Sequence, residues 1–135
     1  MAFALHPTLA RDTVEVARLA LCRVLLMNDR RFPWLILVPE REDLREIHDL
    51  PPAERSTLIE EIAHAGRVLV DLFQPDKLNT GALGNLVPQL HLHVIARFKA
   101  DAAWPGPVWG SGAAVVYAAS DLEEIRRRIA KAFAG

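Results

Sequence analysis

The feature that most constrains the fold is a stretch near residue 90 in which polar and apolar side chains alternate. Residues 87–97 read Val-Pro-Gln-Leu-His-Leu-His-Val-Ile-Ala-Arg. A period of two is typical of a β-strand, whose successive side chains point to opposite faces. The pattern predicts a strand with one apolar face toward a core. Its other face carries Gln89, His91 and His93.

Three interpretations of this polar face remain open. It can be a solvated strand face without chemistry. The two histidines, spaced i and i+2, can bind zinc, although the other histidines and the single cysteine lie elsewhere in the sequence and no third ligand is evident. Finally, one imidazole can attack phosphorus while the other manages charge and protons, because imidazole works as nucleophile, base or acid near neutral pH.

The segment before the strand favours the phosphorus interpretation. Residues 79–86 read Asn-Thr-Gly-Ala-Leu-Gly-Asn-Leu, which is typical of a turn-rich loop. Its two glycines can take positive φ and let backbone N–H groups approach an anion closely. A phosphate-sized ligand would then lie beside the two histidines.

At this point the chain resembles a known family. The pattern N-x-G-x-x-G-x-x-V-x-Q-φ-H-φ-H-φ-φ, from Asn79 to Ile95, resembles the signature of the histidine triad (HIT) superfamily of nucleotide hydrolases and transferases. The run Trp34–Pro39 looks like the inner strand of that family, and residues 103–106, Ala-Trp-Pro-Gly, resemble its Trp-Pro segment. The resemblance covers roughly residues 13–106.

The resemblance assigns roles to individual residues. It implies that His91, the middle triad position, attacks the α-phosphate, with His93 as the third position. Gln89 stands where the family has its first histidine, and we count it with the catalytic set. The predicted substrate-binding residues lie around this strand, in the preceding loop, and in the polar turn after residue 27, where either Asn28 or Asp29 can bind ribose hydroxyls. They are Asn28, Asn79, Gly84, Asn85, Leu86 and Trp104.

Gln89 also limits the prediction. A carboxamide can donate a hydrogen bond but cannot deliver a proton as an acid. Loss of one preorganised donor can cost on the order of a hundredfold in rate. We predict an enzyme that needs no metal or cofactor. Because of Gln89 we keep a nucleotide-binding module without turnover as one alternative, and a zinc-dependent hydrolase is the other.

Composition describes an ordinary globular chain. Its 135 residues predict one domain, 1–135, and a formal charge of −1 argues against binding to a nucleic acid polymer. One cysteine suits a reducing compartment, and neither a signal peptide nor a membrane-spanning run is evident, so we expect a cytoplasmic protein. The resemblance further implies a homodimer whose sheets continue across the two-fold axis.

The expected architecture is α+β, with an antiparallel sheet of about five strands, one long helix and a C-terminal helix. A stripe of apolar residues between two proline signals predicts the long helix over residues 52–73. Ser120 and Glu123 resemble a capping box for the last helix. We also expect Arg97 and Lys99 to face solvent, and His6 to lie in an irregular lead-in. The remaining expected elements are strands over 13–16, 21–27, 32–38 and 113–118, a short strand over 76–79, and a short helix over 40–47.

Overall fold

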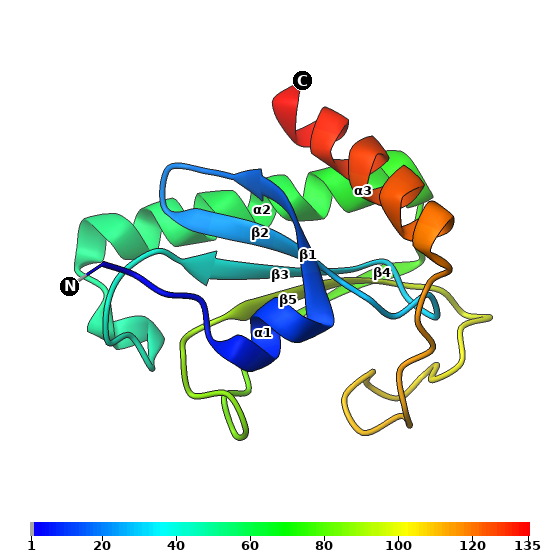
Figure 1. Cartoon of the computed structure of the whole chain (residues 1–135), viewed down its shortest axis with the longest axis horizontal. Helices are drawn as coiled ribbons and strands as arrows, with labels where there is room; N and C mark the ends of the chain where they lie inside the picture. Colours follow the sequence, from blue (N-terminus) through cyan, green and yellow to red (C-terminus); the bar gives the residue numbers. More distant parts are fainter. Residues whose placement is uncertain (1) are drawn as a thin grey trace.

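A five-stranded antiparallel sheet with helices packed against it forms the protein, so the predicted α+β class is confirmed. The computed structural model describes residues 2–135. The strands lie in the order β1-β2-β3-β5-β4 (Figure 1). The elements are α1 (Pro7–Asp12), β1 (Thr13–Arg18), β2 (Cys22–Met27), β3 (Trp34–Pro39), the 3-10 helix η1 (Ile47–Asp49), α2 (Pro52–Phe73), β4 (Lys77–Gly81), β5 (Leu92–Arg97) and α3 (Ala119–Ala134).

The long helix α2 has the predicted bounds and covers one face of the sheet (Figure 1). Pro52 is tolerated in the first turn, where the missing N–H has no partner to lose. The helix ends at Gln74 in the left-handed conformation, just before Pro75. Its apolar stripe packs with α3 and one face of the sheet into the larger core, to which β5 contributes Leu92, Val94 and Ala96.

The other face of the sheet carries a second, smaller core. Phe32 precedes β3, whose Trp34, Ile36 and Val38 lie in this core together with Ile95 of β5. Helix α1 adds Leu9, and the loop after β5 adds Val108. His91 and His93 belong to this face, because β5 alternates as the sequence predicts.

Several local predictions were wrong. β5 begins only at Leu92, so residues 87–91 lead into the strand without being part of it. Residues 40–46 are irregular, and the helical turn η1 begins after them at Ile47. Residues 113–118 form an extended segment that is not in the sheet, and α1 replaces the expected irregular lead-in after His6. The expected capping box is not made, since α3 begins after Ala118 without a side-chain cap.

Arg97 was expected outside and is instead 1% exposed, whereas Lys99 is exposed as predicted. The guanidinium of Arg97 pairs with the carboxylate of Asp101 and donates to Asn79 Oδ1 at 2.7 Å. It also donates to the carbonyl of Gly106 at 2.8 Å. Since each of the three guanidinium nitrogens donates to an acceptor, the residue can be buried on the same face as the histidines.

Within residues 2–135, no helix is both long enough and apolar enough to cross a bilayer.

Candidate functional site

A cleft of about 510 Å³ opens on the face of the sheet that carries the histidines. Its walls come from α1, the strands β2 and β3, the loop before β5, and the loop after it. The lining residues that the sequence singled out or that carry polar groups are Thr8, Asp12, Asp29, Arg31, Trp34, Gly84, Asn85, Leu86, His91, His93 and Trp109. The predicted juxtaposition of the two histidines with the glycine loop is therefore present.

The two imidazoles lie in contact, with ring centroids 4.9 Å apart and planes at 65°. Nδ1 of His91 lies 2.7 Å from the backbone carbonyl oxygen of Gln89. A carbonyl only accepts, so this nitrogen carries the proton and Nε2 keeps its lone pair. Nε2 has no protein partner within residues 2–135, and the ring lines the cleft. His91 thus has the tautomer that a nucleophile needs.

His93 has the opposite tautomer. Its Nδ1 accepts a hydrogen bond of 3.0 Å from the indole Nε1–H of Trp34, so Nε2 carries the proton. Burial, and to a lesser degree the neighbouring His91, lowers the pKa of His93 to about 3. The ring is therefore neutral over the physiological range and can donate one hydrogen bond from Nε2.

Three of the predicted binding residues lie at the cleft, and their roles in binding stay predictions. Gly84, Asn85 and Leu86 all line the cleft. Gly84 has φ +74°, a conformation that L side chains rarely adopt, so glycine is required to turn the loop there. The side chain of Leu86 is 94% exposed at the cleft mouth.

Four predicted residues are not among those that line the cleft. Asn28 Oδ1 accepts from the backbone N–H of Tyr117, and Asn79 Oδ1 accepts from Arg97. The ring of Trp104 lies against the guanidinium of Arg97, 5.8 Å from its Cζ. The side chain of Gln89 turns toward the N-terminal residues. Their functional roles stay predictions.

Asp29, the alternative to Asn28, does line the cleft and is 1% exposed. Burial opposes its ionisation, but hydrogen bonds from the side chain and backbone of Arg31 and from the N–H of Val115 outweigh burial and lower its pKa. Arg31 is held in turn near the carbonyls of Ser111 and Gly112. This places a fixed ion pair at the cleft wall.

Sequence reasoning missed two other walls. Trp109 lines the cleft and packs edge-on against His93, with centroids 5.3 Å apart. The density of tryptophan, proline and glycine in its loop was a usable signal, but it pointed equally to Trp104. The residues from α1, Thr8, Leu9 and Asp12, gave no signal at all, because so short a helix has no periodicity to detect.

Donors for a metal are sparse. In the described part of the chain, no three His, Cys, Asp or Glu side chains are grouped so that they could hold an ion. The zinc alternative therefore lacks a third ligand beside His91 and His93 among these residues.

Comparisons with protein families and with solved structures point to one family. The HIT domain model matches residues 10–100. A histidine triad protein from Bradyrhizobium japonicum is 43% identical with a TM-score of 0.93, covering 97% of this chain and 98% of that one. Histidine triad proteins from Sinorhizobium meliloti (44%, TM-score 0.92, 96% of each chain) and Marinobacter aquaeolei (43%, TM-score 0.94, 98% of this chain and 96% of that one) are similarly close. No curated protein matches the chain.

Proposed function

This chain belongs to the HIT domain family, and from that premise we propose that it hydrolyses or transfers nucleotides at the α-phosphate. The substrate is a nucleoside phosphate, phosphoramidate or dinucleoside polyphosphate, and the reaction passes through a covalent nucleotidyl-histidine. The observation that carries the proposal is the fixed tautomer of His91, whose Nδ1–H is held by the carbonyl of Gln89. An unprotonated Nε2 facing a cleft is the requirement for attack on phosphorus.

The first step forms a bond between Nε2 of His91 and the α-phosphorus and breaks the bond from phosphorus to the leaving group. Backbone N–H groups near Asn85 and Leu86 bind the phosphate oxygens, because that loop borders the cleft. His93 donates from Nε2 to a phosphate oxygen or to the leaving group and stabilises charge that develops in the transition state. Because a neutral His93 with a pKa of about 3 is a hydrogen-bond donor and not a strong acid, good leaving groups should be preferred.

In the second step water, phosphate or another acceptor attacks phosphorus and breaks the N–P bond, which returns His91 to its neutral form. Asp29 accepts hydrogen bonds from ribose hydroxyls in this proposal, since it lines the cleft and Asn28 does not.

The test is incubation with labelled adenosine 5′-phosphoramidate or a dinucleoside polyphosphate. We expect an acid-labile adduct on His91, and a loss of at least roughly a thousandfold in kcat for His91→Ala. His48→Ala is the matched control, because the side chain of His48 is 80% exposed and is not among the residues that line the cleft. Tight nucleotide binding by the unmodified protein without adduct or product would instead support the non-catalytic binding module.

We also propose a homodimer that forms at the edge strand β4 and extends the sheet. β4 is the last strand in the sheet order, and a groove of about 290 Å³ runs beside it against α2. The groove is lined by apolar groups that include Ile62, Val70 and Leu78. Light scattering on the purified protein should give twice the chain mass of 15.0 kDa. A monomer at micromolar concentration would contradict the dimer.

A further inference from the structure

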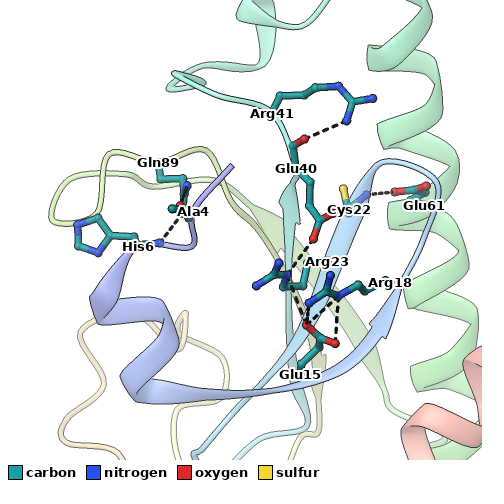
Figure 2. Close-up of polar contacts among 10 residues, drawn as sticks. All are labelled: Ala4, His6, Glu15, Arg18, Cys22, Arg23, Glu40, Arg41, Glu61 and Gln89. Atoms are coloured by element: carbon teal, nitrogen blue, oxygen red, sulfur yellow. Dashed lines mark hydrogen bonds and ion pairs between the residues drawn. The ribbon is translucent and has the colours of Figure 1, made fainter. Parts of the chain in front are cut away.

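Both polar groups of the Gln89 side chain hydrogen-bond to one segment of the chain, residues 2–12, here called the N-terminal segment. Its Oε1 accepts from the backbone N–H of His6 at 2.9 Å, and its Nε2 donates to the backbone carbonyl of Ala4 at 2.9 Å (Figure 2). The carboxamide therefore pairs with the segment as a backbone peptide group would. An imidazole, whose donor and acceptor lie on different sides of a ring, cannot make both contacts to residues so close together.

The N-terminal segment forms one wall of the cleft. After Ala4 it enters α1, whose first turn is capped by Nδ1 of His6 accepting from the N–H of Thr8. Leu9 is buried against the β3 face, and Thr8, Leu9 and Asp12 line the cleft. A helix of only six residues is not stable alone, so its position depends on its contacts.

The same residue also touches the nucleophile. The backbone carbonyl of Gln89 accepts from Nδ1 of His91, while its side chain holds the N-terminal segment. One residue thus connects the wall of the cleft to the ring that we propose reacts.

On this geometry, and resting on the function proposed above, we propose that Gln89 is a positioning residue. It fixes the N-terminal segment as a wall of the substrate cleft and takes no part in proton transfer. The replacement of the first triad histidine by glutamine then exchanges a ring for a two-point attachment of that segment. Phe3 and Leu5 also pack partly against the smaller core, so the fold should survive loss of the attachment.

The test removes the attachment from either side. Gln89→Ala removes both hydrogen bonds. Of the two hydrogen bonds to Gln89, His6→Pro removes only the one from the His6 N–H to Oε1, at a position whose φ of −55° proline accepts. His6→Ala is the matched control, because it keeps that N–H and loses the side-chain cap in common with His6→Pro. For Gln89→Ala we expect a rise in KM and in the Kd for adenosine monophosphate of roughly tenfold, with kcat within about twofold, as for the loss of two hydrogen bonds, one partly buried and one exposed.

His6→Pro should weaken binding more than His6→Ala does, and the double variant Gln89→Ala/His6→Pro should bind no more weakly than Gln89→Ala/His6→Ala, which lacks the same cap. Gln89→His should behave like Gln89→Ala. If Gln89→Ala lowers kcat with KM unchanged, or Gln89→His raises kcat, then Gln89 acts on the chemistry and the proposal is wrong.

Amide hydrogen exchange on the free proteins separates this proposal from the proposed function. Gln89→Ala should speed exchange of the His6 amide and its neighbours by roughly tenfold, as expected for loss of a local stabilising contact. This result would support the attachment even if the unmodified protein neither binds nor turns over nucleotides, in which case only the proposed function fails. Unchanged exchange would overturn the attachment whatever the activity.

Discussion

At the scale of single residues, the site shows how two identical side chains receive different properties from their partners. His91 is paired with an acceptor, the carbonyl of Gln89, and keeps its lone pair on Nε2. His93 is paired with a donor, the indole of Trp34, and keeps its proton on Nε2. The division between nucleophile and hydrogen-bond donor is therefore set by the neighbours of each ring at Nδ1.

Trp34→Phe should disturb His93 and leave His91 in place. Without the indole N–H, Nδ1 of His93 loses the bond that favours its unprotonated form, and the smaller ring admits water, so both changes raise the pKa of His93 above about 3. We expect nitrogen-detected NMR to show mixed tautomers of His93, with kcat reduced roughly tenfold. A single unchanged tautomer in the variant would contradict the role of Trp34.

The sequence predicted the face of His91 and His93 because the alternation holds throughout β5 and just before it. It could not predict the contacts of Gln89, which lies three residues before the strand and turns toward a segment more than 80 positions away in sequence. It also placed Arg97 in solvent, because the pattern shows which face a side chain is on but not whether a loop covers that face. Asp101, only four residues later, is the partner that allows the burial.

At the scale of elements, the Arg97–Asp101 pair holds the loop after β5 onto the sheet. The side chains are 2% and 3% exposed, and Asp101 also accepts from the backbone N–H groups of Phe98, Ala103 and Trp104. Burial opposes ionisation of Asp101, but these bonds outweigh it and hold its pKa well below the ordinary value. The same loop continues to Trp109, so the pair also positions a wall of the cleft.

Arg97→Met should therefore destabilise the protein strongly. Removing one partner of a buried pair leaves the other charge uncompensated, which costs about 3–5 kcal/mol in the free energy of unfolding. Arg126→Met is the control, since its ion pair with Glu123 lies on the exposed surface of the helix, where such a pair contributes little to stability. Urea denaturation measures both, and similar losses for the two variants would refute the role of the buried pair.

Elements with strong local signals were predicted well, and those determined by distant partners were not. The bounds of α2 follow from the apolar stripe along its 22 residues and from the prolines at its two ends. Residues 113–118 look like a strand in the sequence, but Val115 and Tyr117 donate their N–H groups to the side chains of Asp29 and Asn28 instead of to a neighbouring strand. The polar turn before β3 thus takes the place of a strand partner, and no local pattern records that.

At the scale of the whole molecule, the sheet has one face for stability and one face for the site. The face under α2 and α3 is filled with aliphatic side chains. The opposite face combines apolar groups with buried Asp29, His91, His93 and Arg97. Burying ionisable groups to shape a cleft makes the stability of the whole domain depend on pH.

His93 determines the pH range over which the stability changes. The pKa of His93 is about 3 in the folded protein, against an ordinary value of 6.5. Below pH 6.5 this residue therefore binds a proton in the unfolded chain but not in the folded one. The stability is complete above that pH and falls as pH drops toward 3, by about 1.4 kcal/mol per pH unit for this group. His93→Phe should reduce the slope of unfolding free energy against pH between 6 and 4 by roughly that amount. His48→Gln, at an exposed site, is the control, and an equal slope in His93→Phe and the unmodified protein would rule the assignment out.

The single thiol of the chain lies where it can report on opening of the sheet. Cys22 is 1% exposed in β2, between β1 and β3, and both its own N–H and that of Leu21 donate to the carboxylate of Glu61 from α2 (Figure 2). Burial, followed by the adjacent Glu61, raises the pKa of the thiol, so hardly any reactive thiolate exists while α2 stays seated. Alkylation by iodoacetamide should therefore require a transient opening that separates α2 from the strands. The rate of alkylation at this one thiol then measures how often the domain opens, without any engineered label. Rapid modification under native conditions would mean that the contact between β2 and α2 around Cys22 opens independently of the rest of the domain.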